Sequence, residues 1–563
     1  MNPAERVRGA YERIAAVDRP EVWISLRPLA DVLAEAAAVA ERVQGGEELP
    51  LAGLTVAVKD NIDVGGLPTT AACPAFAYQP RGSAPAVARL CQAGAVVLGK
   101  TNMDQFATGL VGTRTPYGAV RDARRLDYVA GGSSSGSAVA VALGIADIGL
   151  GTDTAGSGRV PAAFQGIVGA KPTRGLVPTA GVVPACRTLD CVSVFTRELG
   201  VAQAALGVLA RPPARAWPAH APLGAPPGAV IGVPNALPGL SAAARERFTN
   251  AAARLRRAGH TLVEVDIEPF LAAGRLLYEG AFVAERYAAV GSFVKRHPHE
   301  VDATVGAIIS GAGGIAASAL VADGERLEHL RVQADAALAG AHALLVPTTT
   351  AQPRIDDVGA DPLGVNARLG TYTNCANLLD LCAVAAPAGE ADGGCFGVTL
   401  LGRAFADALV AELAADLVLG DEDGRRVPGP ALSPPRVELF VVGAHRLGQP
   451  LNAELTARGA RMLHAIATAP EYRLHRLRTE PPKPGLLRVE QGGASVEGEL
   501  WALPPAGLAE LVAALPAPMA LGRVRLRDGS EPIGFLCEPA ALEGTEDITA
   551  WGSWTTYRQL AGV

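Results

Sequence analysis

The sequence predicts an α/β protein in which helices cover a β-sheet, followed by a smaller α+β domain. Between residues 54 and 109, short apolar runs rich in β-branched residues alternate with stretches of helical spacing, an order typical of a sheet covered by helices. A polar, proline-rich segment at residues 420–435 interrupts this pattern, and a new set of apolar runs begins at residue 437. With 563 residues, the chain is long enough for more than one domain.

Apolar residues at helical spacing predict two helices within residues 1–45, ending at the turn Gly45-Gly46. The run at residues 54–58 predicts a buried strand, because it is short, apolar and β-branched. The other elements expected before the proline-rich segment are helices at residues 84–93, 243–259, 271–294 and 404–419, a helix that opens within residues 103–109, and strands at residues 95–98 and 343–346.

The proline-rich segment also sets the domain boundaries. We expect a helical segment at residues 1–50 that packs on a main domain at 51–420, a linker at 421–436, and a second domain at 437–563. Within the second domain, residues 437–442 predict a strand. Residues 489–500, with Gly492-Gly493 at the turn, predict a β-hairpin.

The composition argues against several classes of protein. The net charge of −6 and the absence of basic runs argue against a nucleic-acid partner, and no apolar run reaches the roughly 18–20 residues of a membrane span. The charged N-terminus is unlike a secretory signal. Eight cysteines without C-x-x-C spacing indicate neither a disulfide framework nor a metal site, so Cys186 and Cys191 are expected to be buried apolar residues. We therefore expect a cytoplasmic protein without a membrane or nucleic-acid partner.

Glycine and serine cluster in two neighbouring segments, GGSSSGS at residues 131–137 and GLGTDTAGSGRVP at residues 149–161. A flexible linker is one alternative, but an apolar segment follows the first run directly, and the phosphate-loop pattern GxxxxGK[ST] is absent. In the second segment, Ser157 stands between Gly156 and Gly158. Small neighbours expose a hydroxyl, and consecutive N–H groups can face a developing oxyanion, so Ser157 is a candidate nucleophile.

A nucleophilic serine needs a base, and none of the nine histidines lies within residues 51–200. A distant histidine could still fold back onto Ser157. The local alternative is Lys59, which directly follows the strand expected at residues 54–58 and is one of only five lysines among 50 basic residues. If Lys59 is buried, its pKa falls and its neutral amine can accept a proton. An exposed or ion-paired lysine is the competing interpretation.

The surroundings of Lys59, the GGSSSGS run and the run GTDTAGSGRVPAAFQGIVGAKPTRG at residues 151–175 resemble the amidase signature family over about residues 50–420. This resemblance implies the amidase-signature fold, a mixed β-sheet covered by helices. It also implies a Ser-Ser-Lys triad, in which Ser157 is the nucleophile, Ser133 is the bridging serine with a cis peptide bond, and Lys59 is the base.

The same resemblance assigns the oxyanion donors to the N–H groups of Thr154, Ala155, Gly156 and Ser157. The family usually has Gly where Ala155 stands, a departure that need not abolish the function because the backbone N–H is the donor. Asp153 and Lys171 are expected to be structural.

Tyr278, Phe282 and Arg286 follow one another at intervals of four residues, so they would share one face of a helix. If that face is directed at a pocket, the tyrosine and the arginine suit a small carboxylate, which arginine binds through two parallel hydrogen bonds. A surface arginine that lies over an apolar helix is an equal alternative.

This stretch, the Asp153-Thr-Ala-Gly-Ser157 variant, the segment Asn377-Leu-Leu-Asp-Leu381 and the added C-terminal domain are together similar to the allophanate hydrolases within that family. The resemblance implies cleavage of urea-1-carboxylate, with Tyr278 and Arg286 holding its carboxylate, no cofactor or metal, and release of ammonia and, after decarboxylation, carbon dioxide. It further implies a homodimer and association with urea carboxylase or other enzymes of urea or cyanuric acid breakdown.

The segments Val441-Val-Gly-Ala-His-Arg-Leu-Gly448 and Glu497-Gly-Glu-Leu-Trp501 are similar to the γ-glutamylcyclotransferase-like fold. In allophanate hydrolases this domain has been assigned either decarboxylation of the first product or an assembly role. His445 is the candidate residue for the former, and a packing role for a loop histidine is the alternative.

Three other functions stay open at this point. The chain could be the amidase subunit of a tRNA-dependent amidotransferase, an amidase of broader substrate range, or a non-catalytic scaffold. The added domain and the Tyr278/Arg286 spacing argue against the first, and the intact set of Lys59, Ser133 and Ser157 argues against the last.

Overall fold

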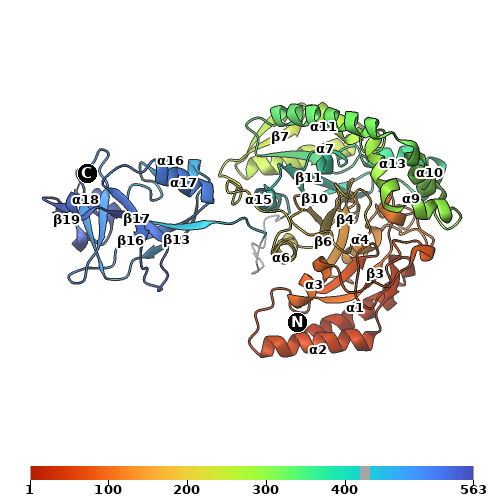
Figure 1. The fold of residues 1–563 in the computed structure, drawn as a ribbon, viewed down its shortest axis with the longest axis horizontal. Helices are drawn as coiled ribbons and strands as arrows, with labels where there is room; N and C mark the ends of the chain where they lie inside the picture. Colours follow the sequence, from red (N-terminus) through yellow and green to blue (C-terminus); the bar gives the residue numbers. More distant parts are fainter. Residues whose placement is uncertain (1, 419–431, 562–563) are drawn as a thin grey trace. The chain divides into compact units, whose positions relative to one another are not determined.

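A computed structural model describes residues 2–418 and 432–561, which form two compact units (Figure 1). The first unit comprises Met1–Ala216 and Gly224–Ser433, and the second comprises Trp217–Leu223 and Pro434–Val563. The short segment 217–223, which the sequence assigned to the main domain, joins the second unit, where Ala219 O accepts a hydrogen bond from the Ala506 N–H at 3.0 Å. Most of the expected linker, residues 421–431, lies outside the described residues.

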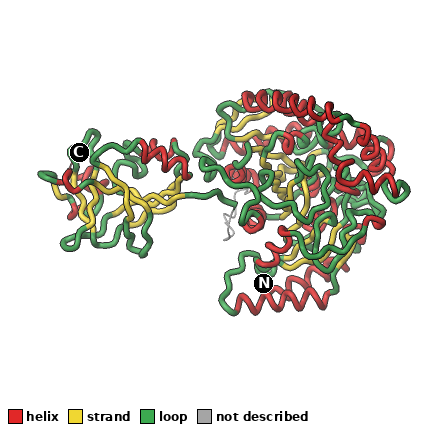
Figure 2. Tube along the Cα trace, viewed as in Figure 1, coloured by secondary structure: helices red, strands yellow, loops and turns green. Residues whose placement is uncertain are grey.

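The first unit is built on an eleven-stranded mixed sheet (Figure 2). Its strands, in spatial order, are β1 (Trp23–Leu26), β3 (Val96–Thr101), β2 (Thr55–Lys59), β4 (Ile148–Asp153), β6 (Cys191–Thr196), β5 (Val168–Lys171), β10 (Cys382–Ala391), β11 (Gly394–Gly402), β9 (Ala343–Pro347), β7 (Val230–Pro234) and β8 (Thr261–Val265). Every residue of β2, β3, β4, β5, β6 and β9 is buried, which explains the short apolar runs at residues 54–58, 95–98 and 343–346, where β2, β3 and β9 lie.

The helices of the first unit pack around this sheet, and two of them come from the N-terminal segment. In α1 (Pro3–Val17), the Asn2 side chain caps the first turn by accepting the Ala4 N–H. Its apolar face shares one buried cluster with that of α2 (Leu29–Gln44). The other helices are α3 (Pro85–Gln92), α4 (Ser135–Ala142), α5 (Val160–Gln165), α6 (Leu199–Leu209), α7 (Ala242–Arg257), α8 (Glu268–Arg275), α9 (Ala284–Arg296), α10 (Ala303–Gly311), α11 (Ala317–Ala337), α12 (Ile355–Ala360), α13 (Pro362–Leu369), α14 (Cys375–Leu378) and α15 (Asp407–Val418).

Most elements expected in the first unit are confirmed, including β2, β3, β9, α3 and α7, but two helix predictions are wrong. Residues 103–109 contain only a 3₁₀ turn (Gln105–Ala107), in which Phe106 and Ala107 take positive φ values of 50° and 53°. The Asp104 carboxylate holds this loop by accepting the N–H groups of Val111, Gly112 and Arg114. The side chain of Asp104 thus competes with helix formation.

The long helix expected at residues 271–294 is interrupted. Helix α8 ends at Arg275, a 3₁₀ turn spans Ala281–Val283, and α9 begins at Ala284. The Ala281 N–H donates to Asp323 Oδ2 of α11 at 2.6 Å instead of to a carbonyl one turn earlier. A tertiary hydrogen bond therefore overrides the local helical pattern.

The second unit contains a five-stranded and a three-stranded sheet. The larger sheet orders β13 (Arg461–Ala467), β16 (Glu497–Leu503), β12 (Val437–Val441), β18 (Ile533–Cys537) and β17 (Met519–Arg523), and the smaller orders β15 (Pro484–Arg488), β14 (Tyr472–Arg476) and β19 (Glu546–Asp547). Three helices accompany them: α16 (Asn452–Ala457), α17 (Pro505–Ala513) and α18 (Trp554–Ala561). The strand expected at residues 437–442 is confirmed as β12.

The prediction of a β-hairpin at residues 489–500 is wrong. Strand β15 ends at Arg488 and pairs with β14, whereas β16 begins at Glu497 and pairs with β12 and β13 of the other sheet. Between them, the Ala494 N–H donates to Tyr472 O, so the Gly492-Gly493 turn crosses from one sheet to the other. The turn itself was identified correctly, but β15 pairs with the preceding strand β14, and β16 pairs with β12 and β13.

No single helix in the described ranges is long and apolar enough to cross a membrane. One helix pair, Ala303–Gly314 with Ala317–Ala337, meets the length and composition criteria together, but it is bent by 99° at its break.

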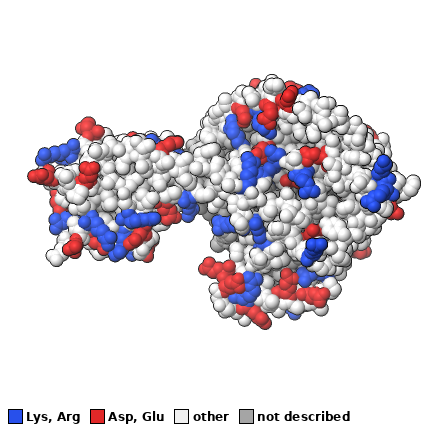
Figure 3. Space-filling view, in the orientation of Figure 1, with Lys and Arg blue, Asp and Glu red and all other residues white. Residues whose placement is uncertain are grey.

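The surface of the molecule carries both signs of charge. In the view of Figure 3, basic and acidic side chains are interspersed over both units, and no large area of one sign is seen on this face. This agrees with the small net charge of −6.

Candidate active site

Lys59, Ser133 and Ser157 converge at one edge of the first unit's sheet. Strands β2 and β4 are parallel neighbours, so their carboxyl ends meet at the same edge; Lys59 is the last residue of β2, and Ser157 follows β4 by four residues. Ser133 lies just before α4. Lys59 Nζ donates to Ser133 Oγ at 2.8 Å, and Ser133 Oγ is 2.9 Å from Ser157 Oγ. The three side chains expected to form the triad therefore form one continuous hydrogen-bonded chain.

The environment of Lys59 favours its neutral amine. The side chain is fully buried, and within the described residues Nζ bonds only to hydroxyl oxygens, Ser133 Oγ and Thr152 Oγ1, each at 2.8 Å. Burial lowers the pKa of Lys59 to about 7, and the more distant carboxylates of Asp104 and Asp153 only partly oppose this effect. Near neutral pH a large fraction of Lys59 can therefore accept a proton.

Ser133 is held by the loop that carries Asp104. The Gly132–Ser133 peptide bond is cis, as the resemblance implied. The Ser133 carbonyl accepts the Asp104 N–H at 3.3 Å, and the Asp104 carboxylate packs so closely against Gly132 that a Cβ atom there would collide with it. Asp104 was not singled out from the sequence, because an isolated aspartate in a loop carries no pattern.

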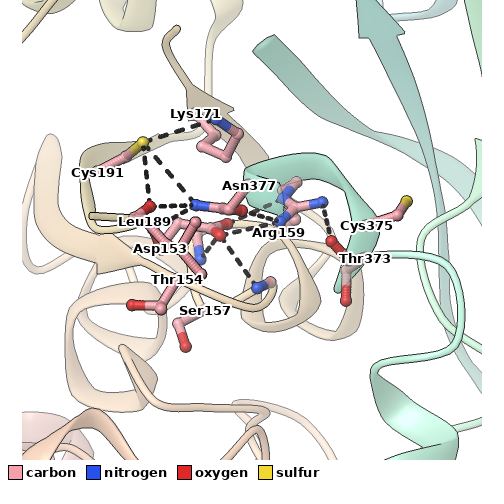
Figure 4. A network of polar contacts seen from close by, with 12 residues as sticks. Asp153, Thr154, Ser157, Arg159, Lys171, Leu189, Cys191, Thr373, Cys375 and Asn377 are labelled. Carbon is pink, nitrogen blue, oxygen red and sulfur yellow. Dashed lines mark hydrogen bonds and ion pairs between the residues drawn. The ribbon is translucent and has the colours of Figure 1, made fainter. Parts of the chain in front are cut away.

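The loop that carries Ser157, residues 154–159, is called the nucleophile loop below and is fixed by a buried ion pair (Figure 4). Arg159 donates to both carboxylate oxygens of Asp153 at 2.9 Å, and the same carboxylate accepts the N–H groups of Gly156 and Gly158. Burial alone would raise the pKa of Asp153, but the charge and hydrogen bonds of Arg159 outweigh it and lower that pKa. Asp153 therefore stays ionised and shapes the loop.

This network changes the expectation for Gly156. Its N–H was expected to face an oxyanion, but it donates to Asp153 Oδ1 at 3.0 Å. Within the described residues, no hydrogen bond engages the N–H groups of Thr154, Ala155 or Ser157. Gly156 itself has a φ of +137°, and its Cα faces the Thr373 side chain so closely that no Cβ would fit.

Helix α14 braces the loop from the far part of the chain (Figure 4). Asn377 donates to Asp153 O at 2.8 Å and to Leu189 O at 2.9 Å, and its Oδ1 accepts from Arg159 at 3.2 Å. Arg159 also donates to Thr373 O at 3.0 Å. The segment around Asn377 had been noted only for its resemblance, and its contacts with the loop could not be read from the sequence.

Arg286 and Tyr278 meet, although not through one continuous helix. Tyr278 lies in the turn after α8, Phe282 in the 3₁₀ turn and Arg286 in α9, yet Arg286 Nη2 donates to the Tyr278 hydroxyl at 3.0 Å. The prediction of a shared helix face is therefore wrong, because the helix is interrupted between them. Arg286 is only 1% exposed, so it is not a surface residue lying over an apolar helix.

The guanidinium of Arg286 has no acidic partner. Its other bonds go to Ala107 O at 3.3 Å and Thr108 Oγ1 at 3.0 Å. Among the described residues, no carboxylate oxygen lies within 4.0 Å of it, and its Nε has no hydrogen-bond partner. Because a buried charge is normally paired, this site is suited to an anion supplied from outside the chain.

A cavity of about 1330 Å³ adjoins Tyr278 but is not lined by Arg286. Tyr278 lines it, together with residues of α8 and α13 and with Asn374 before α14. Lys59, Ser133 and Ser157 are not among its lining residues; they are buried, and Ser157 is 3% exposed. Tyr278 therefore connects the cavity to the buried arginine.

His445 lies in the second unit, at a separate cavity of about 370 Å³. Its ring stacks on Phe535 with centroids 4.8 Å apart, and its Nε2 is 3.5 Å from Glu454 Oε2. Burial lowers the pKa of His445, and the contact with Glu454 partly opposes that shift. Two basic side chains, Arg458 and Lys483, line the same cavity.

The remaining candidate residues behave as follows. All eight cysteines are free, with Cys186 and Cys191 buried as expected. Lys171 is buried and donates to Pro172 O, consistent with a structural role. In the described part of the chain, no histidine bonds to Ser157, and no group of three or more His, Cys, Asp or Glu side chains could hold a metal ion.

The large mixed sheet covered by helices and the similarity to known amidases define the class of protein as a hydrolase that acts on amides. The chain belongs to the amidase signature family: the amidase family model matches residues 5–411, and the model of the allophanate hydrolase C-terminal domain matches residues 437–559.

Known proteins resemble the chain over most or all of its length. It is 42% identical to a urea amidolyase of Lachancea kluyveri over 95% of this chain, but it spans only 31% of that protein. A solved structure of Kluyveromyces lactis allophanate hydrolase matches with a TM-score of 0.87 and 38% identity, covering 100% of this chain and 97% of that one. A glutamyl-tRNA(Gln) amidotransferase subunit of Symbiobacterium thermophilum is 35% identical over 74% of this chain and 92% of its own length.

Proposed function

We propose that this chain hydrolyses the terminal amide of allophanate, urea-1-carboxylate, by a Ser-Ser-Lys mechanism. One observation carries the choice of substrate: Arg286 is buried beside the Tyr278 hydroxyl and has no carboxylate partner within the described residues. A substrate carboxylate would supply the missing negative charge. The names of the relatives, urea amidolyase and allophanate hydrolase, support the same substrate.

The contacts of Arg286 also relate the carboxylate site to the triad. Arg286 donates to Ala107 O, the Ala107 N–H donates to Asp104 O, and the Asp104 N–H donates to Ser133 O. Three hydrogen bonds thus separate the arginine from the bridging serine. A substrate held at Arg286 by its carboxylate would present its other end toward Ser157, as a short molecule such as allophanate requires.

In the proposed acylation step, neutral Lys59 accepts a proton from Ser133 while Ser133 accepts one from Ser157. Ser157 Oγ attacks the terminal amide carbon, and the N–H groups of Thr154, Ala155 and Ser157 stabilise the oxyanion. The Gly156 N–H is omitted because it donates to Asp153. Protonated Lys59 then returns a proton through Ser133 to the leaving nitrogen, and ammonia departs.

In the proposed deacylation step, water attacks the acyl-enzyme and gives up a proton through Ser133 to Lys59. As the bond between the acyl carbon and Ser157 Oγ breaks, protonated Lys59 returns a proton through Ser133 to Ser157 Oγ and becomes neutral again. The product is a nitrogen that carries two carboxylates. Loss of one carboxylate as carbon dioxide leaves carbamate, which decomposes to ammonia and a second carbon dioxide. Removal of a base or of oxyanion donors typically lowers the rate by roughly 10²- to 10⁴-fold, so each member of this chain should matter.

The most direct test of this proposal measures ammonia release from allophanate without any added cofactor. We expect turnover of allophanate and weak turnover of acetamide, which has no carboxylate. Arg286→Ala should mainly raise KM, whereas Arg275→Ala should not, because Arg275 lines the cavity beside Tyr278 but already pairs with Glu268. Efficient turnover of simple amides with none of allophanate would reject the substrate, and an unchanged KM in Arg286→Ala would reject the role of Arg286.

The amidase component of a tRNA-dependent amidotransferase is the main rival within the family, since one such protein is 35% identical. That similarity covers 74% of this chain and leaves the second unit without a counterpart. The unpaired Arg286 would also suit the carboxylate of an amino acid. Turnover of allophanate by the purified chain alone distinguishes the two.

A second function is proposed for the second unit, namely decarboxylation of the first product. The cavity at His445 carries Arg458 and Lys483, whose positive charges would bind a dicarboxylated nitrogen. We further propose that the protein is a homodimer in the cytoplasm and cooperates with urea carboxylase, since its relatives include urea amidolyases that are much longer than this chain. Whether urea or cyanuric acid is the upstream source depends on the enzyme that supplies allophanate.

A further inference from the structure

Two adjacent residues beside the nucleophile loop carry buried oxygens without a hydrogen-bond partner. Within the described residues, neither Thr373 Oγ1 nor Asn374 Oδ1 has one. Thr373 is fully buried, and its side chain packs against Gly156 of the nucleophile loop. Figure 4 shows the Thr373 side chain pointing to the same side of the ion-pair network as the Ser157 hydroxyl.

Asn374 faces the cavity that Tyr278 also lines. It is 8% exposed, and its carboxamide packs against Gly370, where any Cβ would collide with it. On its other side, a Cβ atom on Gly274 of α8 would crowd the Asn374 Cβ at 3.3 Å. Two glycines thus form a slot that fixes the position of the side chain, in which the buried Oδ1 has no hydrogen-bond partner among the described residues.

A neighbouring asparagine shows the ordinary situation. Asn366 lines the same cavity and is similarly buried, but its Oδ1 accepts the Leu110 N–H at 2.7 Å. Buried acceptors are nearly always satisfied in this way, because an unmade hydrogen bond is costly. The free Oδ1 of Asn374 therefore points to a donor that arrives with the substrate.

We propose that Asn374 is a specificity-determining residue whose Oδ1 accepts the central N–H of allophanate. This inference rests on the proposed function. In allophanate the central N–H lies between the carboxylate and the carbon that Ser157 attacks. Asn374 is linked to both of the corresponding sites: it shares a cavity with Tyr278, which contacts Arg286, and its neighbour Thr373 contacts the nucleophile loop.

The test compares allophanate with malonamate, in which a CH₂ group replaces the central N–H and the carboxylate and terminal amide are unchanged. Wild-type enzyme should favour allophanate, because malonamate leaves the Asn374 acceptor unpaired. In Asn374→Leu, which has similar volume and no acceptor, the ratio of the two kcat/KM values should fall roughly tenfold or more. Thr371→Val, a change in the same cavity wall, should leave that ratio unaltered.

Retained malonamate turnover in Asn374→Leu would show that this variant is folded. Asn374→Ala is a second variant, for which we expect the same fall in the ratio of the two kcat/KM values. A parallel loss for both substrates, or an unchanged ratio, would assign Asn374 a purely structural role and overturn the inference. If the wild type turns over allophanate and the ratio of the two kcat/KM values is unaltered in the variants, the inference about Asn374 is rejected and the proposed function is not. Turnover of malonamate but not of allophanate by the wild type rejects the proposed function as well.

Discussion

Three of the five lysines are buried in the main sheet, and their partners differ in a way that explains why Lys59 can act as a base. Lys100 forms a fully buried ion pair with Asp60 at 3.0 Å. Lys171 donates to the carbonyl of Pro172 and lies close to the thiol of Cys191. Lys59 touches only hydroxyl groups, with no carboxylate within 4.0 Å among the described residues. Burial without a direct counter-ion favours loss of its proton.

The pH dependence of catalysis should report this lysine. In the proposed mechanism Lys59 acts in its neutral form, and its pKa is lowered to about 7, so kcat/KM should fall about tenfold per pH unit below that value and level off above it. A profile from pH 5 to 9 in a buffer series of constant ionic strength measures this acid limb. An acid limb that begins near pH 4, or a rise that continues to pH 10, would contradict a buried neutral lysine as the base.

At the scale of single residues, the sequence could predict those features that a residue's type and its motif determine. Ser133, Ser157 and Lys59 were identified because long motifs carry them, and their convergence follows from two parallel strands that end at one edge. The commitment of the Gly156 N–H to Asp153 and the free oxygen of Asn374 could not be predicted. Both depend on side chains whose orientation is fixed by residues far away in the chain.

At the scale of elements, the nucleophile loop depends on α14, which is four residues long and would not be stable alone. Asn377 of this helix joins the end of β4 to the segment before β6 by donating to Asp153 O and Leu189 O. The helix thus acts as a brace between three parts of the chain that are separated by up to 224 residues.

Replacing Asn377 by Leu should weaken the brace. Its side chain makes hydrogen bonds with two backbone carbonyls and with Arg159, and leaving these groups buried and unpaired should lower the free energy of unfolding by about 2–4 kcal/mol. We also expect kcat to fall more than KM changes, because the loop holds Ser157 and not the carboxylate site. Chemical denaturation and steady-state kinetics measure both effects, with Thr371→Val as the control. Unchanged stability together with unchanged kcat would show that α14 is dispensable.

Local pattern predicted an element well wherever the chain's own neighbours determine it, as in β2, α7 and β12. It was wrong where a distant group competes. Asp323 of α11 takes the N–H that would have continued the helix after Arg275, and pairing with separate sheets divides the segment expected to be a hairpin. Asp323 is 42 residues away from Ala281, and β16 pairs with β12 and β13, which end at Val441 and Ala467, so these partners could not be seen in a local window.

At the scale of the whole molecule, the two units carry two separate cavities, one beside Tyr278 and one at His445. The fold class and both family memberships could be predicted from the sequence, because the motifs are long and the proline-rich segment marks a change of pattern. The inclusion of residues 217–223 in the second unit could not, since it depends on a contact with Ala219.

If the second unit decarboxylates the first product, His445→Ala should change the rate of carbon dioxide release without changing the rate of early ammonia release. Early ammonia release depends on the first unit and should be unaltered. Carbon dioxide release should slow roughly tenfold or more, because the variant removes the His445 imidazole from the cavity. Membrane-inlet mass spectrometry can follow carbon dioxide while ammonia is assayed in parallel. His464→Ala, an exposed change on β13, is the matched control. Equal rates in both variants would leave the second unit with an assembly role instead.

The central claim is that a buried, unpaired Arg286 selects an anionic substrate for a Ser-Ser-Lys amidase. The most direct test is the ratio of kcat/KM for allophanate to kcat/KM for biuret, its neutral counterpart of similar size in which a carboxamide replaces the carboxylate. Because biuret leaves the guanidinium without a counter-charge, we predict a ratio of at least about 100 for the wild-type protein. A ratio near one, or a preference for biuret, would contradict the account.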